Sequence, residues 1–144
     1  MKVVVQRSKE SFVKVDNKIV GKINSGLVLL VGFTHKDSED DIKAMVNKII
    51  NLRIFDDENK IMNKNILEVN GNILSISQFT LYANTSKGNR PSYIEALNKE
   101  EASMLYDKFN NELRKYLNIE TGIFHADMEV NIINDGPVTI ILEN

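Results

Sequence analysis

The sequence contains few side chains that could act as a catalytic base, a nucleophile or a metal ligand. It has two histidines and no cysteine, which excludes a cysteine nucleophile, a thiolate zinc site and a disulfide scaffold. No histidine pair has metal-ligand spacing, and no serine lies in a nucleophile-elbow motif. His35 reads as an exposed loop residue, and His125 alternates with Phe124 and Ala126 in a predicted strand. The spacing of residues therefore predicts no metal site, no cofactor and no Ser-His-Asp triad.

Two stretches carry polar residues that do not fit their setting. In Ser77-Gln78-Phe79-Thr80-Leu81, polar side chains interrupt the simple alternation expected of a strand that begins near residue 73. A half-buried strand whose hydroxyl groups pair with neighbours would also explain this pattern. The second stretch, Asn134-Asp135-Gly136-Pro137-Val138-Thr139, contains turn residues, and its pattern alone predicts an ordinary turn.

Length and composition bound the class of protein. A chain of 144 residues suits one domain. No apolar run approaches the ~20 residues that a membrane-spanning helix needs, and the N-terminal stretch is too polar for a signal peptide. We therefore expect a soluble, cytoplasmic protein. The formal net charge of −2 does not indicate a nucleic-acid-binding protein, so RNA contact would require a local basic patch.

Hydrophobic periodicity predicts more strands than helices. Strands are expected at residues 3–5, 12–15, 19–23, 27–33, 73–81, 124–133 and 138–142. The continuous apolar run over residues 27–33 predicts a strand buried on both faces. One helix is expected after Ser38, with an apolar stripe over residues 42–50. A second is expected over residues 98–117, opened by a capping-box pattern of Asn98 and Glu101. Together they predict a single α+β domain over residues 1–144, with two main helices packed against a mainly antiparallel, barrel-like sheet.

The two polar stretches resemble the signature motifs of the D-aminoacyl-tRNA deacylases, also called D-tyrosyl-tRNA(Tyr) deacylases. Further matches extend along the chain and include Val5-Gln6-Arg7, Asn51-Leu52-Arg53-Ile54-Phe55, Lys87-Gly88-Asn89-Arg90-Pro91-Ser92 and Thr121-Gly122-Ile123-Phe124. A related branch that edits other mischarged tRNAs carries Pro-Gln-Ala-Thr-Leu in the first motif. Ser77 and Phe79 place this chain outside that branch.

The resemblance implies a hydrolase that cleaves the ester of D-aminoacyl-tRNA and thus proofreads chirality in translation. It also implies a homodimer with two active sites at the interface. In the family the Gly-Pro bond is cis and enters the partner's pocket. Carried over, Gly136 and Pro137 would present two parallel carbonyls that exclude an L-residue, and Arg7 would hold them in place. Such a barrier is independent of side-chain identity, so many D-amino acids would be accepted and glycyl esters would partly escape it.

For the chemistry, the family motif allows two mechanisms. In the first, Thr80 is the nucleophile and forms an acyl intermediate, although no activating base lies nearby in sequence. In the second, the main-chain N–H groups of Phe79 and Thr80 bind the ester carbonyl, and water attacks with help from the 2′-hydroxyl of the terminal adenosine. Ser77 and Gln78 complete the catalytic motif in either case. The scarcity of acid–base residues favours the second mechanism.

Substrate contacts are expected from two further groups of residues, one beside the amino-acid pocket and one in a basic patch. Met128 and His125 would lie beside the adenosine and amino-acid pocket, where His125 replaces a usually small residue and could stack on the terminal base. Lys87 and Arg90 form the best local basic patch for tRNA, with Lys60 and Lys64 as further candidates. A solvated loop would explain this patch equally well.

Two other functions fit the same sequence. A non-catalytic RNA-binding module could keep the basic loop on this fold without catalysing hydrolysis. A small-molecule esterase would cleave free D-amino-acid esters without tRNA, whereas assistance by the tRNA 2′-hydroxyl predicts little activity on them.

Overall fold

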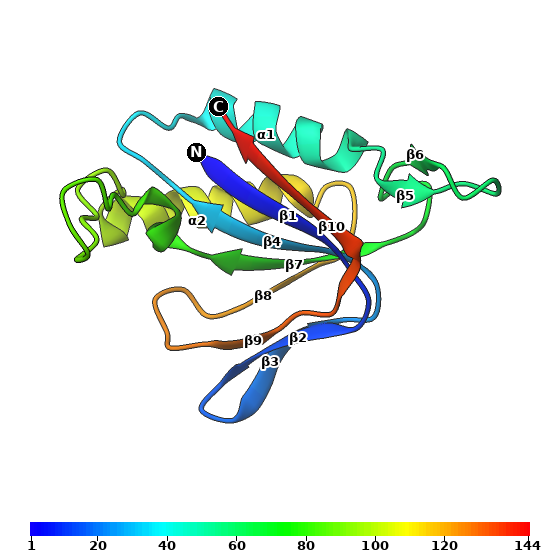
Figure 1. The fold of residues 1–144 in the computed structure, drawn as a ribbon, viewed down its shortest axis with the longest axis horizontal. Coiled ribbons are helices and arrows are strands. Elements are labelled where there is room, and N and C mark those ends of the chain that lie inside the picture. The colour runs from blue at the N-terminus through cyan, green and yellow to red at the C-terminus, as the bar shows by residue number, and fades with distance from the viewer.

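The computed structural model describes residues 1–144 and shows a main β-sheet with two helices on one face (Figure 1). Five strands form this sheet in the order β10-β1-β4-β7-β8. They are β1 (Lys2–Ser8), β4 (Gly26–Gly32), β7 (Asn72–Ser77), β8 (Ile119–Thr121) and β10 (Asn134–Glu143). β1 is antiparallel to β4 and β10, whereas β7 is parallel to β4 and β8. The main sheet is therefore mixed.

Two smaller antiparallel sheets complete the fold. β2 (Ser11–Val15) lies between β3 (Lys18–Ile23) and β9 (Glu129–Asn131), and β5 (Phe55–Asp56) pairs with β6 (Met62–Lys64). The single α+β domain with two helices agrees with the prediction. The order of the main sheet ends at β10 and β8 and does not return on itself, so the barrel-like closure is not confirmed.

The two helices begin where their capping residues predicted. α1 (Glu39–Asn51) has Ser38 as its N-cap, with a reciprocal hydrogen bond from the Ser38 main chain to the side chain of Asp41. α2 (Lys99–Leu113) begins after Asn98, whose side chain accepts from the N–H of Glu101. α2 ends four residues earlier than predicted, and the next residues continue as a turn. Neither helix is long and apolar enough to cross a membrane.

The main core lies between the helices and the sheet. Its buried side chains include Val5, Leu29, Ile49, Phe109 and Leu113. A second cluster, on the opposite face of the sheet, contains Val13, Ile23, Val28, Leu74 and Ile76. β4 contributes to both clusters, which explains its continuous apolar run and confirms the prediction of a strand buried on both faces.

Three predicted elements are wrong, and two of the errors fall at the two motifs. The strand expected over residues 73–81 ends at Ser77, and the 3₁₀ helix η1 (Phe79–Tyr82) follows. The strand expected over residues 124–133 shortens to β9, because the chain turns at residues 123–126 and His125 adopts a φ of 65°. His is among the residues that tolerate this left-handed conformation better than most.

The third error concerns residues 134–137, which belong to β10 and do not form a turn between two strands. Gln6 pairs with Thr139 and Ser8 pairs with Asn134, so β10 has more residues than β1 between these two points. The extra residues form a bulge, a feature that locally interrupts a ladder and redirects the strand. Pro137 has no N–H to donate to the ladder, and a bulge is one of the places where a strand accepts proline.

Candidate functional site

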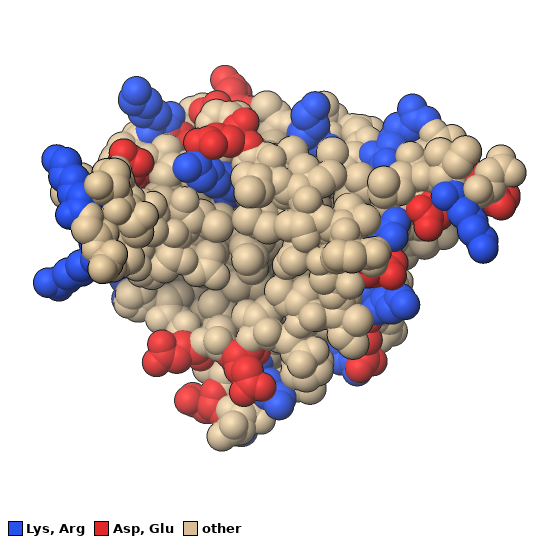
Figure 2. All heavy atoms as spheres, viewed as in Figure 1, with Lys and Arg blue, Asp and Glu red and all other residues tan.

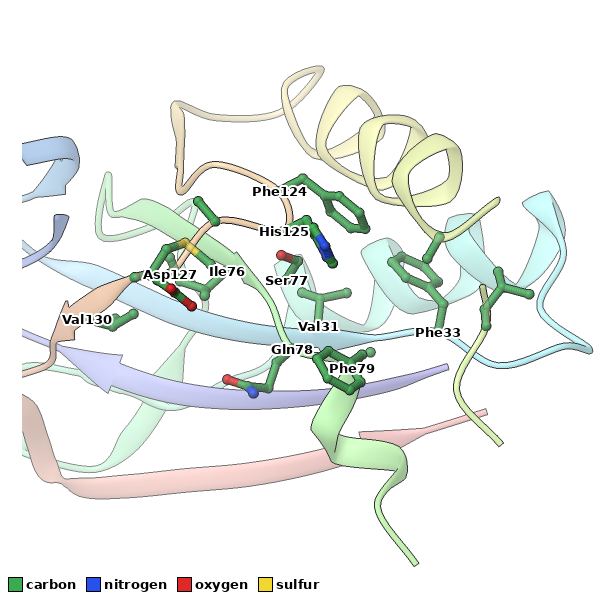
Figure 3. A pocket seen from close by; sticks show the side chains of 15 residues that line it. Val31, Phe33, Ile76, Ser77, Gln78, Phe79, Phe124, His125, Asp127 and Val130 are labelled. Carbon is green, nitrogen blue, oxygen red and sulfur yellow. The ribbon is translucent and has the colours of Figure 1, made fainter. Parts of the chain in front are cut away.

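A cavity of about 560 Å³ opens at the C-terminal ends of β4 and β7 (Figure 3). Most of its lining is apolar and comes from segments far apart in the sequence: Val31, Gly32, Phe33, Ile76, Ser77, Gln78, Phe79, Leu97, Ala102, Phe124, His125, Ala126, Asp127, Met128 and Val130. We call it the main cavity. A concave and mostly apolar pocket with a few polar groups is the usual form of a small-molecule site.

The first motif forms one edge of the main cavity. Ser77, Gln78 and Phe79 line it, whereas Thr80 lies one residue further along η1 and is not among the lining residues. Phe79 and Thr80 are the first two residues of η1, and the first N–H groups of a helical turn have no acceptor within that turn. The N–H of Gln78 donates to Val31, which ties the start of η1 to β4.

The hydroxyl of Thr80 accepts a hydrogen bond from the side-chain amide of Gln78. This amide is a donor to the Thr80 oxygen, so it cannot remove the hydroxyl proton. No imidazole or carboxylate donates to or accepts from this hydroxyl in the structure. The surroundings of Thr80 therefore lack the base that an activated threonine nucleophile requires.

Gly32 sets how closely β4 can approach the first motif, a role that the sequence patterns did not reveal. A Cβ at this position would lie 2.9 Å from the carbonyl oxygen of Gln78 and 3.4 Å from the Tyr82 ring. Any larger residue would push the motif away from β4. The available signal was a glycine at the end of an otherwise apolar run.

The opposite edge of the main cavity comes from the segment that joins β8 to β9. His125 and Met128 both line the cavity, as the resemblance implied for substrate-binding residues, and the His125 ring points into it (Figure 3). Asp127 lines the same edge. His125 and Asp127 are the only two ionisable side chains among the lining residues. The cavity is thus better equipped to enclose a substrate than to exchange protons with it.

Two tyrosines close to the cavity stay protonated at neutral pH. Burial raises the pKa of Tyr82, the last residue of η1. Burial also raises the pKa of Tyr106 on α2, whose hydroxyl donates to the carbonyl of Ser75. A phenol with a raised pKa does not act as a base at neutral pH. These side chains support the site through packing and hydrogen bonding.

The second motif lies outside the main cavity. Gly136 and Pro137 are exposed, and the bond between them is cis. Arg7 is nearly buried beside them, and its Nε lies 3.4 Å from the carbonyl oxygen of Asp135 and 3.2 Å from the carboxylate of the same residue. Its Nη1 donates to the carbonyl of Ile54 at 2.8 Å. Arg7 thus connects the second motif to the segment that leads into β5.

In one chain the two motifs lie at opposite ends of the main sheet. Lys2 of β1 pairs with Gly32 at the cavity end, and Arg7 pairs with Leu27 at the end that carries Gly136. The two pairs are five residue steps apart along β1, which corresponds to ~17 Å. A single chain therefore does not bring Gly136 and Pro137 to the first motif.

The predicted basic patch is divided between two places. Lys87 and Arg90 line a second, smaller cavity in the loop after η1. Lys64 belongs to β6 and forms an ion pair with Glu58, and this hairpin lies across the molecule from the green loop that follows η1 (Figure 1). Lys60 lies in the same β5–β6 hairpin. Of these four residues, only Lys87 and Arg90 lie in the loop that follows the first motif.

Comparison with known proteins gives consistent matches over the whole chain. The family model described as D-Tyr-tRNA(Tyr) deacylase matches residues 4–143. Proteins named D-aminoacyl-tRNA deacylase from Bacillus cytotoxicus and Bacillus cereus are 56% and 55% identical to this chain, and each match covers 100% of the chain and 99% of the relative.

Solved structures with the same fold include two with informative descriptions. One, described as c-Myc DNA Unwinding Element Binding Protein, has a TM-score of 0.95 and 40% identity and covers 100% of this chain and 99% of that one. Another, described as a probable eukaryotic D-amino acid tRNA deacylase, has a TM-score of 0.84 and 18% identity and covers 98% and 97%. The second likeness supports the fold alone. From the full-length matches in sequence, this chain belongs to the D-Tyr-tRNA(Tyr) deacylase family.

Proposed function

We propose that this chain, as one domain over residues 1–144, hydrolyses the ester bond of D-aminoacyl-tRNA in the main cavity. The products are tRNA and a free D-amino acid. Relatives that bear the name D-aminoacyl-tRNA deacylase match the whole chain at 55–56% identity. The observation that carries the proposal is that the first motif lines an apolar cavity with almost no acid–base side chains and begins η1 there, where the N–H groups of Phe79 and Thr80 have no acceptor within the helical turn. The same resemblance makes the cytoplasm, where translation occurs, the expected location.

In the proposed reaction, the N–H groups of Phe79 and Thr80 donate to the ester carbonyl and to the negative charge that develops on its oxygen. Water adds to the carbonyl carbon, and its proton passes to solvent with help from the 2′-hydroxyl of the terminal adenosine. The bond to the ribose 3′-oxygen then breaks, and that oxygen takes up a proton. Fixed donors aimed at a developing oxyanion are often the largest single contribution to such reactions.

In this mechanism Thr80 acts through its main-chain N–H, which binds the oxyanion, and not through its hydroxyl group. The hydroxyl already accepts from Gln78, and an ester needs less activation than an amide when it is held in the right orientation. The roles of Ser77 and Gln78 are then to shape the edge of the cavity and to hold η1. Val31, Phe33 and Phe124 offer the amino-acid side chain an apolar surface without a specific polar partner. Such a surface suits many different side chains.

A second copy of the chain would supply the Gly136–Pro137 segment to the main cavity. The face of β1, β4 and β10 opposite the helices carries Val4 between its pairing partners Leu30 and Ile141. Ile141 is 69% exposed in the single chain, which leaves an apolar surface for a partner. A two-fold axis across this face would invert the strand direction, so each cavity would meet the opposite end of the partner's sheet.

In this dimer, the main chain of Gly136 and Pro137 faces the α-carbon of the bound residue. A rigid main-chain group there clashes with the side chain of an L-residue and leaves room for a D-residue. Discrimination by extra fit alone is worth only about 1–3 kcal/mol per methylene, whereas a clash penalises the wrong enantiomer directly. Glycine has no side chain to clash, so glycyl-tRNA is expected to be cleaved to some extent.

The function is tested by hydrolysis of the same tRNA charged with a D-amino acid and with its L-enantiomer. The purified protein is expected to cleave the D-ester at least about 100-fold faster, since the barrier acts on the L-side chain alone. Equal rates, or no cleavage of either ester, would reject the proposal. Rapid cleavage of free D-amino-acid esters would indicate a small-molecule esterase. Binding of nucleic acid without any hydrolysis would indicate a module like the relative described as a DNA-element-binding protein.

A further inference from the structure

A second cavity, of about 280 Å³, lies in the loop that follows η1. Its lining is almost entirely polar and includes Asn84, Ser86, Lys87, Arg90, Ser92 and Glu95. We call it the polar cavity. Its volume is close to the lower end of small-molecule sites, which run from about 300 Å³ upward. The polar cavity therefore suits one small polar group and not a second amino-acid side chain.

The loop around the polar cavity is held closed by its own hydrogen bonds. Asn84 and Ser92 exchange two main-chain hydrogen bonds of 2.8 and 2.9 Å. The side-chain oxygen of Asn84 accepts from both the N–H and the hydroxyl of Ser86. Lys87 and Arg90 thus extend from a closed loop. Figure 2 shows blue side chains projecting at the left edge, where Figure 1 has the green loop after η1.

One aromatic pair lies between the polar cavity and the main cavity. Phe79 lines the main cavity, and its ring contacts that of Tyr93 edge-on, with centroids 5.1 Å apart. Tyr93 follows Ser92, which lines the polar cavity. Phe79 is 54% exposed and Tyr93 is 39% exposed. Exposed aromatic rings next to basic side chains are typical of proteins that bind single-stranded nucleic acid.

We infer that the polar cavity binds the phosphodiester that precedes the terminal adenosine of the tRNA. The inference rests on the proposed function, which places the aminoacylated adenosine in the main cavity. Because Phe79 of the main cavity contacts Tyr93, the neighbour of Ser92 in the polar cavity, the preceding phosphate would then reach the loop. Arg90 offers paired donors that match phosphate oxygens, and Lys87 adds a mobile positive charge. Tyr93 provides a surface on which a neighbouring base stacks.

Glu95 is the one acidic residue among those that line the polar cavity. Its carboxylate repels a bound phosphate and reduces the net attraction of Lys87 and Arg90. Substitution of the cations and substitution of Glu95 are therefore expected to change the affinity for phosphate in opposite directions. Removal of the cations weakens binding of the phosphate, and removal of the Glu95 charge strengthens it.

The test compares the binding of two non-hydrolysable probes in which an amide replaces the ester. One is a D-aminoacyl adenosine, and the other carries a cytidine attached through a 5′-phosphodiester. For the unaltered protein we expect the dinucleotide to bind at least about tenfold more tightly, as one or two charge-assisted hydrogen bonds would give. Replacement of Lys87→Gln with Arg90→Gln is expected to remove most of this advantage. The slope of log affinity against log salt concentration should also become shallower by about 0.7 for each phosphate that is no longer neutralised.

The matched control replaces two exposed lysines elsewhere, Lys18→Gln with Lys48→Gln, and is expected to keep the advantage of the dinucleotide. Glu95→Gln is expected to increase it. An advantage that survives Lys87→Gln with Arg90→Gln, or that the control removes equally, would overturn the inference. The D- and L-ester rates of the unaltered protein report separately on the proposed function. If the protein cleaves the D-ester selectively but the affinity ratio of the two probes is unchanged in Lys87→Gln with Arg90→Gln, phosphate binding in the polar cavity is rejected and the proposed function stands. Failure of both probes to bind would also reject phosphate binding in the polar cavity.

Discussion

Phe79→Pro is expected to lower the kcat for D-aminoacyl-tRNA by roughly 10²–10³-fold, the usual effect of removing one donor from an oxyanion-binding site. Proline at this position removes the main-chain N–H that we assign to the ester carbonyl. Phe79 is the first residue of η1, and Gln78 before it has a φ of −146° and a ψ of 79°, outside the α region that a following proline disfavours. Proline is well tolerated at the first position of a helical turn, where the N–H has no acceptor within the turn. The fold should therefore survive the change.

The matched control is Phe79→Ala, which removes the same ring but keeps the N–H. We expect it to lower kcat/KM by no more than about tenfold, because it removes contact area and leaves the oxyanion donor in place. Thr80→Ala is expected to fall in the same small range, since its N–H is also retained. Single-turnover hydrolysis measured for the three variants separates these effects. Complete loss of activity in Thr80→Ala with an intact fold would instead indicate a threonine nucleophile.

Gly136→Ala is expected to reduce kcat/KM for D-aminoacyl-tRNA by about 100-fold, a loss that a misplacement of about 1 Å can cause. Gly136 has a φ of 119°, which residues with a side chain rarely adopt. A Cβ there would lie 2.9 Å from the N of Val138 and 3.2 Å from Nη2 of Arg7. The segment would have to move, and the main-chain groups that oppose an L-residue would move with it. The ratio of D- to L-ester cleavage should fall as well.

Gly88→Ala is the control for this change. Gly88 has a similarly unusual φ of 132°, but a Cβ there would meet no atom within 4 Å. Gly88→Ala therefore introduces the same kind of backbone strain as Gly136→Ala but does not force neighbouring atoms to move. Thermal unfolding of both variants, measured beside the two ester rates, shows whether stability explains any loss of activity. Gly88 lies beside Lys87, so its replacement is expected to affect both esters equally; an effect of Gly136→Ala on the ratio of D- to L-ester cleavage no larger than that of Gly88→Ala would contradict the assigned role of Gly136.

The sequence predicted those elements whose local signals agree with their packing. The capping residues Ser38 and Asn98 marked the starts of both helices, and the apolar run of β4 indicated a strand between two apolar layers. The start of η1 was not predictable in the same way. No glycine or proline lies between Ser77 and Tyr82 to indicate the end of a strand. The turn at this point depends on the tertiary hydrogen bond from Gln78 to Val31.

The candidate site was predictable in its residues and not in its geometry. The motifs and their neighbours His125 and Met128 were identified from the sequence, and the structure places these two residues with the first motif around the main cavity. That the second motif lies at the other end of the sheet follows only from the pairing of β1 with β4 and β10. Strand register of this kind depends on long-range pairs that local patterns do not encode.

The most direct test of the two-chain site is to mix two strongly impaired variants and allow their subunits to exchange. Phe79→Pro impairs the first motif, and Gly136→Ala impairs the second. If each site uses the first motif of one chain and Gly136 of the other, mixed dimers contain one intact site. Half of randomly re-formed dimers are mixed, so the mixture should regain about a quarter of the activity of the unaltered protein. A mixture that exchanges subunits but gains no activity over the separate variants would contradict the account, because a site built within one chain cannot be restored by mixing.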